Sequence, residues 1–236
     1  MAYFLTDNRF FFNLTASGYD FMTAQSLWRA QIEAALVHLS GPDEVHRILD
    51  LGCGPGVSAF VLAERFPGAT VVGLDISDEM IRRARRHHRR RFPDLDNVTF
   101  QRGDVYQMPF TGDHFDLVMG HSFLYLLPHR LQALKAIEQT LRPGGQLLLL
   151  EPALEGSLVG ACRQISLQEA IASPLSAARF ATSMLLWRLV SNRRGQMREA
   201  ELLSLFEEAG LTDALVHSTL GGLGYHARAT KGSGSL

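Results

Sequence analysis

The sequence predicts an α/β fold in which helices cover both faces of a doubly wound, mostly parallel sheet of seven strands. From residue 48 onward, short apolar runs alternate with amphipathic helical patterns, and repeated strand-helix-strand units favour parallel pairing. Three glycines between the first apolar run and the first helix mark a turn where another molecule can approach the backbone. With 236 residues and 46% hydrophobic composition, the chain is expected to form one domain, 1–236.

Five of the expected strands are short apolar runs with turn residues on either side. They span residues 48–51, 70–74, 98–100, 115–119 and 146–150. Between them, apolar residues at helical spacing predict a helix at 59–66, which ends before a Pro-Gly pair. The same spacing predicts a helix at 134–141, which ends before the string RPGG.

The last part of the chain predicts an edge hairpin. Residues 202–209 form an amphipathic helical pattern, and Gly210 is expected to end this helix in a left-handed conformation. Residues 212–220 and 224–230 then read as two strands that pair antiparallel across a Gly-Gly turn. The Gly/Ser-rich residues 231–236 are expected to form a disordered tail.

Two further segments do not follow the strand-helix alternation. Residues 1–40 are expected to form an N-terminal helical segment, with a helix at 32–39 leading into the first strand. Residues 153–196 mix apolar and polar positions with helical character, and they are expected to form a helical cap inserted into the domain.

Composition excludes several classes of protein. A net charge of −1 gives no global field of the kind that draws a protein to nucleic acid. The two cysteines, Cys53 and Cys162, fit a reducing compartment and exclude a disulfide framework, so a cytoplasmic location is expected. No stretch reaches the roughly 18 apolar residues that a membrane span requires, and polar residues interrupt the apolar start too early for a signal peptide.

The glycine turn is better suited to a nucleoside without phosphates than to a nucleotide. A dinucleotide fingerprint, G-x-G-x-x-G, would need glycine at Val57, and a phosphate-binding P-loop would need lysine there. Asp50 before the turn and Asp104 after the third strand make this edge of the sheet acidic, which disfavours a pyrophosphate. S-adenosylmethionine, which has a ribose, a base and a cationic sulfonium but no phosphate, has the required properties.

Five motifs in order give the chain a family resemblance. The strings ILDLGCGPG, VVGLD, GD, FDLVMG and LRPGGQLLLLEP resemble the class I S-adenosylmethionine-dependent methyltransferases, and the resemblance covers about residues 21–152. It implies a Rossmann-like methyltransferase fold and an enzyme that transfers a methyl group from this cofactor. The layout is similar to that of quinone-biosynthesis C-methyltransferases, although their substrate motifs are not matched.

The resemblance also implies a set of residues that contact the cofactor. They are Asp50, Gly52, Gly54, Gly56, Asp75, Ile76, Met80, Asp104, Val105 and His121. In this scheme Asp75 accepts hydrogen bonds from both ribose hydroxyls, at roughly 1.5–3 kcal/mol each. Asp104 accepts from the adenine amino group and Val105 donates from its backbone, while Ile76 and Met80 sandwich the adenine.

Methyl transfer from a sulfonium is an in-line displacement whose leaving group needs no proton, so alignment of the reactants supplies most of the catalysis. His121 follows the fourth strand, where it would either accept a proton from the acceptor or shape the cofactor pocket. Tyr125 lies four residues further on, and Tyr19 precedes Asp20 in a pair that resembles one folding over the cofactor in relatives. We consider all three as catalytic candidates.

The acceptor is expected to be a small, apolar or aromatic molecule. The strand end at GHSFLYL lacks the Asn/Asp-Pro-Pro-aromatic string of enzymes that methylate adenine or glutamine amides, and the chain has no Pro-Cys pair. The strings FATSMLLWRLV and YFLTDNRFFFNL offer apolar walls. Two alternatives stay open: a protein that binds the cofactor without catalysis, and an enzyme that uses another part of the cofactor.

Seven arginines lie between Arg82 and Arg91. A solvated helix face is one interpretation, and peripheral contact with an anionic membrane is another; no nucleic-acid partner is expected. No metal site is expected either, because the adjacent His87 and His88 do not converge on one ion in a helix.

Overall fold

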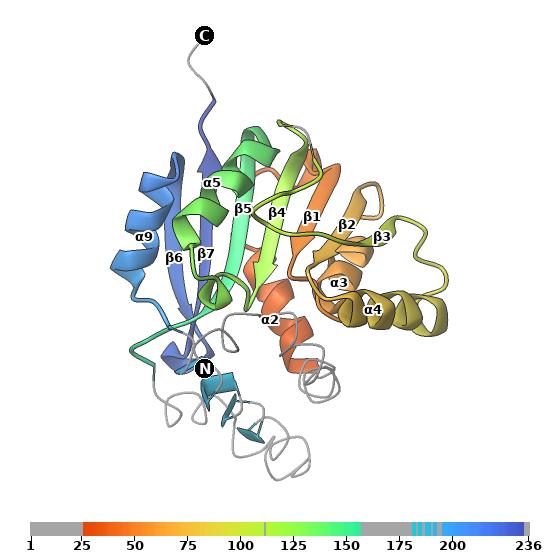
Figure 1. Cartoon of the computed structure of the whole chain (residues 1–236), viewed down its shortest axis with the longest axis horizontal. Coiled ribbons are helices and arrows are strands. Elements are labelled where there is room, and N and C mark those ends of the chain that lie inside the picture. Colours follow the sequence, from red (N-terminus) through yellow and green to blue (C-terminus); the bar gives the residue numbers. More distant parts are fainter. Residues whose placement is uncertain are drawn as a thin grey trace, which may run out of the picture.

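The computed structural model describes residues 26–110, 112–156 and 195–233, together with residues 181, 182, 184, 185, 187–189, 191 and 192. Within these residues, seven strands form one sheet in the order β3-β2-β1-β4-β5-β7-β6 (Figure 1). They are β1 (Arg47–Leu51), β2 (Thr70–Asp75), β3 (Val98–Arg102), β4 (Phe115–His121), β5 (Leu141–Pro152), β6 (Leu211–Thr219) and β7 (Gly224–Lys231).

The pairing confirms the predicted fold class. Strands β1 to β5 pair in parallel, whereas β7 runs antiparallel to both β5 and β6. The predicted edge hairpin is therefore present, and Gly210 before β6 has the left-handed φ of 82° expected after a helix end.

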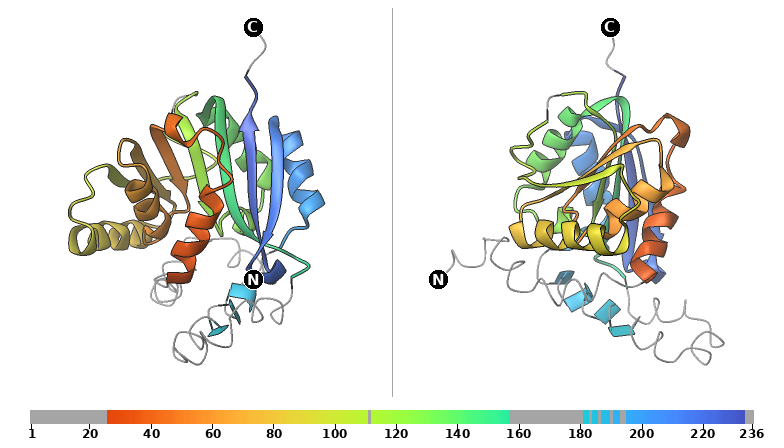
Figure 2. Two further views of the ribbon diagram at one scale, coloured as in Figure 1. Left: turned by 180° about the vertical axis from the view of Figure 1, so that it is seen from behind. Right: turned by 90° about the vertical axis from the view of Figure 1, so that its right-hand side faces the viewer.

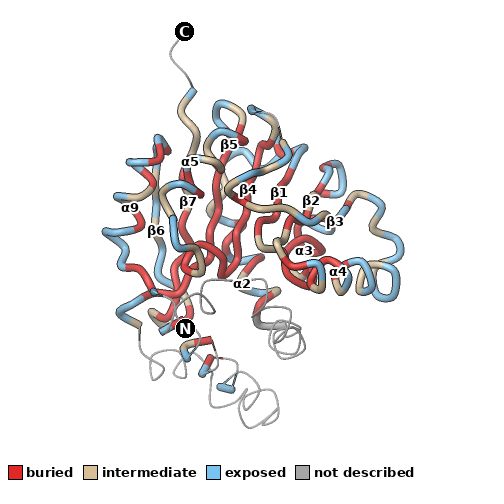
Figure 3. Tube along the Cα trace, in the orientation of Figure 1, coloured by how far each residue is buried: buried red, intermediate tan, exposed pale blue. Residues whose placement is uncertain are grey.

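Helices cover both faces of the sheet, as the edge-on view in Figure 2 shows. They are α2 (Ser26–Leu36), α3 (Val57–Arg65), α4 (Asp78–Arg91), α5 (Arg130–Thr140) and α9 (Glu199–Glu208). Helices α2, α3 and α4 share one apolar core with the sheet, and α5 and α9 share another on the opposite face. Every residue of β4 is buried (Figure 3), which explains why this strand reads as an apolar run without alternation.

Helix α4 packs one side on the sheet and exposes most of its arginines. Ser77 caps its first turn by accepting a hydrogen bond from the backbone N–H of Met80 at 3.2 Å. Ile81 and Ala84 are 4% and 0% exposed and face the sheet, while most of the arginines are exposed. His88 also turns inward, with its Nε2 at 2.6 Å from the carbonyl oxygen of Leu95.

Asp116 joins three strands by hydrogen bonds at the end of the sheet where the parallel strands begin. Its Oδ2 accepts hydrogen bonds from the backbone N–H groups of His46 and Arg47 at 2.8 and 2.6 Å, and its Oδ1 accepts from the Arg142 guanidinium. Partial burial acts to raise the pKa of Asp116, but these hydrogen bonds outweigh it and hold the pKa below its usual value. Strands β1, β4 and β5 are thereby joined through one side chain.

Some boundaries differ from the sequence-based expectation. Strand β5 begins at Leu141 rather than at residue 146, because Leu141 pairs with Phe115 before residues 142–145 bulge out of the ladder. Strand β7 runs through Lys231, so the segment expected to be a tail starts inside the sheet. The Nζ of Lys231 lies 3.0 Å from Asp113.

The predicted cap and N-terminal segment fall partly outside the described residues. Of the cap, the structure describes 153–156, 195, 196 and the helical positions given above; of residues 1–40 it describes 26–40, which include α2. Among the described helices, none has both the length and the apolar character needed to cross a bilayer.

Candidate functional site

The turn between β1 and α3 contains three glycines in left-handed conformations. Gly52 and Gly56 have φ values of 64° and 98°. A Cβ atom at Gly52 would lie 2.7 Å from Cδ2 of Phe123, and one at Gly56 would lie 2.8 Å from Cε2 of Phe60. These two positions therefore require glycine for the chain's own backbone and packing, whatever else approaches the turn.

Asp75 at the end of β2 is directly connected to this turn. Its Oδ2 accepts a hydrogen bond from the backbone N–H of Gly54 at 2.9 Å, and its Oδ1 accepts from that of Ser77 at 2.8 Å. Burial raises the pKa of Asp75 to about 6, although both hydrogen bonds act to lower it. The strand end, the turn and the start of α4 thus share one carboxylate, and each of its oxygens keeps a second lone pair.

Asp50 is a second carboxylate at this edge. It is 0% exposed, and its Oδ2 accepts a hydrogen bond from the Ser58 hydroxyl at 2.6 Å. Its Oδ1 has no hydrogen-bond partner in the described part of the chain. Burial, together with the nearby charge of Asp75, raises the pKa of Asp50 to about 7. An unpaired buried oxygen of this kind is a strong acceptor for a donor or a cation.

The neighbouring strand ends hold the remaining residues that were assigned to an adenine. Strand β3 pairs with β2 so that the backbone N–H of Gly103 donates to the carbonyl of Asp75 at 3.0 Å, which places Asp104 at the same edge. Oδ1 of Asp104 accepts a hydrogen bond from the backbone N–H of Tyr106 at 3.0 Å. Val105 is 6% exposed and packs in the core beside α5.

Ile76 and Met80 lie beside Asp75 at the start of α4. Ile76 is half-buried and follows Asp75 directly, whereas Met80 is 1% exposed in the first turn of the helix. The edge formed by the ends of β1, β2 and β3 thus brings the three aspartates together with two apolar side chains. Sequence reasoning assigned all of these residues, but it did not assign Ser58, which donates to Asp50.

His121 ends β4 on the far side of the glycine turn, and it is 8% exposed. Its ring centroid lies 5.0 Å from that of Trp28 in α2, and Trp28 lies 5.4 Å edge-on from Trp187 of the cap. The Nε1 of Trp187 donates to the hydroxyl of Ser122 at 3.0 Å. We call Trp28, Trp187 and His121 the aromatic cluster; it joins the cap, α2 and the end of β4.

The protonation of His121 is fixed by its surroundings. Burial, with a smaller contribution from His226, lowers the pKa of His121 to about 4. Its Nε2 has no hydrogen-bond partner among the described residues. At neutral pH the ring is therefore uncharged, and one of its nitrogens is available to a donor.

Glu151 was missed by sequence reasoning, although it lies one residue before the end of β5 and Asp75 lies at the end of β2. It is 0% exposed, and its carboxylate accepts hydrogen bonds from the backbone N–H groups of Phe123, Leu124 and Tyr125 at 3.0, 2.7 and 3.0 Å. Burial raises the pKa of Glu151 to about 7. This side chain positions the segment that follows His121.

The three catalytic candidates have different surroundings. Tyr125 is 2% exposed, and its ring packs in the core between the sheet, α5 and α9. His121 alone lies in the aromatic cluster. Tyr19 lies outside the described residues, as does Cys162 of the cap.

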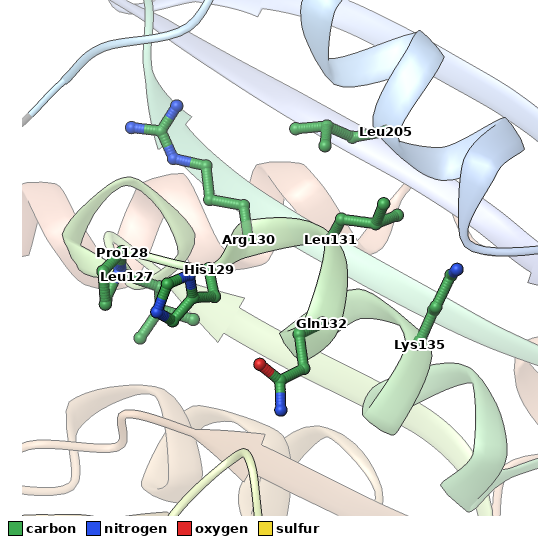
Figure 4. Close-up of a pocket in the computed structure, with 8 residues that line it drawn as sticks. All are labelled: Leu127, Pro128, His129, Arg130, Leu131, Gln132, Lys135 and Leu205. Carbon is green, nitrogen blue, oxygen red and sulfur yellow. The ribbon is translucent and has the colours of Figure 1, made fainter.

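A groove of about 760 Å³ opens elsewhere, between the start of α5 and α9 (Figure 4). It is lined by Leu127, Pro128, His129, Arg130, Leu131, Gln132, Lys135 and Leu205. None of the assigned site residues lines it, and it belongs to the face opposite α2 and α3. In the described parts of the chain, no three His, Cys, Asp or Glu side chains are grouped to hold a metal ion.

Comparison with known proteins places this chain in a family. A family model described as a methyltransferase domain matches residues 42–210. An uncharacterized methyltransferase of Schizosaccharomyces pombe is 29% identical over 152 residues, which are 62% of this chain and 53% of that protein. The demethylmenaquinone methyltransferase of Lactococcus lactis is 34% identical over 147 residues, 59% of this chain and 56% of that protein.

Solved structures share the fold. Phosphoethanolamine N-methyltransferase 2 of Haemonchus contortus, in complex with S-adenosyl-L-methionine, matches with a TM-score of 0.62 at 17% identity, over 86% of this chain and 52% of that one. Identity this low bears on the fold alone. The chain spans about half the length of the curated relatives that it matches.

Proposed function

The chain belongs to the methyltransferase domain family, and on this premise we propose that it binds S-adenosylmethionine and transfers the methyl group to a small apolar or aromatic acceptor. The observation that carries the proposal is the hydrogen bond between Asp75 and Gly54, which unites a carboxylate and a glycine turn at one strand edge. The cofactor supplies a methyl group that is bonded to a positively charged sulfur, and this methyl group is already electrophilic before the cofactor binds. The chain's own residues bind the cofactor and the acceptor, orient them, and exclude water from the site.

The residues at this edge fit a cationic nucleoside. Asp50, Asp75 and Asp104 make the edge acidic, and the unpaired Oδ1 of Asp50 is a buried acceptor that a cationic group would satisfy. Asp75 would take the two ribose hydroxyls with its remaining lone pairs. Strand order supports the location, because β1 and β4 flank the point where the connections diverge and where ligands of such sheets bind.

The other assignments at this edge belong to the same proposal. Asp104 would accept from the adenine amino group, Val105 would donate its backbone N–H to the ring, and Ile76 with Met80 would hold the ring faces. The partial burial of Ile76 supports its contact with the adenine, since the side chain is held by its neighbours but still accessible to a ligand. The remaining candidate, Tyr19, retains its proposed place over the cofactor.

For the acceptor, the aromatic cluster supports a flat or apolar molecule beside His121. Trp28, Trp187 and Met184 form an apolar group at the end of β4, reached from α2 and from the cap. His121 is assigned to orient the acceptor rather than to remove its proton. With a pKa of about 4, taking up a proton at pH 7 costs about 4 kcal/mol, whereas accepting a hydrogen bond at Nε2 costs nothing of that kind. Tyr125 is given no catalytic role.

The cellular setting completes the proposal. Only two cysteines in 236 residues support a reducing compartment, and we assign the protein to the cytoplasm. Contact of Arg82–Arg91 with an anionic membrane would be a separate property. These arginines lie on α4, as Met80 does, but none of them is an assigned site residue.

Product analysis tests the function. The purified chain is mixed with S-adenosylmethionine and a panel of small phenols, quinols and fatty acids. Release of S-adenosylhomocysteine supports methyl transfer, and release of methylthioadenosine means that another bond to sulfur broke. Tight binding without either product favours a non-catalytic binding protein. Acceptor binding is followed through the intrinsic fluorescence of Trp28 and Trp187, the two tryptophans of the chain.

A further inference from the structure

Four arginines of α4 form an exposed cationic surface, which we call the arginine face. They are Arg86, Arg89, Arg90 and Arg91. The earlier arginines of the helix are engaged: Arg82 and Arg83 both bind Glu79, at 2.8 and 2.9 Å. Arg85 donates to the carbonyl of Phe100 at 2.6 Å. No hydrogen bond or ion pair in the described residues engages the arginine face, so its charge is not neutralised within that part of the chain.

A second surface is apolar. In the cap, Leu185 and Leu189 are 46% and 49% exposed and lie one helical turn apart, while Met184 and Trp187 are buried on the other side of the same segment. Leu154, 37% exposed, lies close by, since Arg188 donates to its carbonyl oxygen at 3.1 Å. A helix that is apolar on both sides normally has both sides covered.

The helical segments that carry these two surfaces lie at the same end of the molecule. Figures 1 and 2 show α4 and the helical pieces of the cap at the end of the sheet where β1, β2 and β4 finish. We propose that the arginine face and the exposed leucines together dock the protein on an anionic lipid surface. Headgroup phosphates would neutralise the arginines, and the boundary with the acyl chains would cover the leucines.

A lipid surface fits this pair of features better than nucleic acid does. Nucleic acid would neutralise the arginine face but leave Leu185 and Leu189 in water. Docking at this end would also turn the candidate active site toward the lipid. The inference does not depend on the proposed methyl transfer, because within the described residues no hydrogen bond or ion pair joins the arginine face to an assigned site residue.

Vesicle flotation tests the proposal. The protein is mixed with vesicles of equal parts phosphatidylcholine and phosphatidylglycerol, and with vesicles of phosphatidylcholine alone, at low and at high salt. We expect binding to the anionic vesicles only, weakened by salt. In Arg86→Glu/Arg90→Glu, binding falls at least about 25-fold, because each basic residue near such a surface contributes about fivefold. The matched control Arg65→Glu/Lys135→Glu makes the same charge change on other exposed positions and keeps its binding.

The leucines are tested in the same assay. Leu185→Ser/Leu189→Ser is expected to bind several-fold more weakly, while the control Val37→Ser/Leu215→Ser, also at exposed apolar positions, binds normally. Circular dichroism verifies that each variant is folded, and Arg86→Gln/Arg90→Gln gives an intermediate loss if charge is the cause.

Three results would overturn the proposal. They are absence of binding to anionic vesicles at low salt, binding that survives reversal of the arginines, and binding of an RNA oligonucleotide through these arginines by a chain that ignores vesicles. Calorimetry with S-adenosylmethionine in the absence of vesicles separates failure of docking from failure of the proposed function.

Discussion

Asp75 accepts a hydrogen bond from the backbone N–H of Gly54 at 2.9 Å, so the end of β2 and the turn after β1 are held by one contact. The residue is half-buried and the pKa of its carboxylate is raised to about 6, which means that its ionised form is costly in the free protein. A ligand that donates hydrogen bonds to Asp75 recovers part of this cost. Binding and local order are therefore linked at this residue.

Replacement of Asp75 by alanine is expected to abolish cofactor binding in a folded protein. Loss of two charge-assisted hydrogen bonds, at roughly 1.5–3 kcal/mol each, weakens affinity by at least about a hundredfold. Calorimetry with S-adenosylmethionine measures the change. The control is Asp78→Ala, which removes an exposed carboxylate three residues away and leaves affinity intact. Equal affinity in Asp75→Ala and the wild type would refute the assignment.

Asp50→Asn is expected to change how stability depends on pH. The pKa of Asp50 is about 7 in the folded state and about 3.9 when unfolded, so the folded state holds the proton more strongly. Stability from this group is thus present below about pH 4 and is lost as pH rises through 7, by roughly 4 kcal/mol. Asparagine removes that loss.

Urea unfolding at pH 5 and pH 8 measures the effect. The stability of Asp50→Asn relative to wild type should rise between the two values, whereas the exposed control Asp43→Asn shows no such trend. Comparison with wild type at each pH is needed, because two histidines have the opposite pH dependence. His121 and His226 have pKa values lowered to about 4, so their contribution to the free energy of unfolding is lost as pH falls below 6.5. A parallel pH profile for Asp50→Asn and wild type would contradict the raised pKa.

Glu151→Ala is expected to loosen the segment after His121. The change leaves three backbone N–H groups without their acceptor, and it should lower the free energy of unfolding by about 3 kcal/mol or more. Hydrogen exchange at the amides of 123–125 should rise in step. The control Glu155→Ala removes an exposed carboxylate four residues away. Unchanged exchange at these amides would show that the carboxylate does not hold the segment.

The role of His121 is decided by two substitutions. If His121 orients the acceptor through Nε2, His121→Gln keeps most of the turnover, because glutamine retains an acceptor atom, whereas His121→Ala loses more. A general base would make both variants slow by about 10²- to 10⁴-fold. Wild-type turnover is expected to be flat from pH 6 to 9 as far as His121 is concerned, since its pKa of about 4 lies below this range.

Much of the fold was accessible from the sequence because buried parallel strands have a simple signature. The runs at β1, β2 and β4 are short, apolar and bounded by turns, and each lies where the pattern predicts it. The start of β5 was not accessible. Leu141 joins the strand through a pairing with Phe115 that skips four residues, and such a bulge depends on the partner strand rather than on local residues.

Sequence patterns lead to the side chains of the candidate site more readily than to its backbone contacts. Asp75 and Asp50 could be assigned because each carboxylate has a fixed place next to the glycine motif. The role of Glu151 depends on three backbone N–H groups that come together only in the folded chain, so no spacing in the sequence predicts it. Trp28 lies outside every motif, and its contact with His121 arises from the packing of α2 on the sheet.

The two ends of the sheet differ in how completely their polar atoms are paired. Asp116 joins three strands at the amino end, while Oδ1 of Asp50 and Nε2 of His121, both buried, have no partner at the other end within the described residues. A ligand that forms hydrogen bonds with these atoms would complete the pairing of buried polar groups at the carboxyl edge. Its binding should therefore raise the melting temperature of the protein.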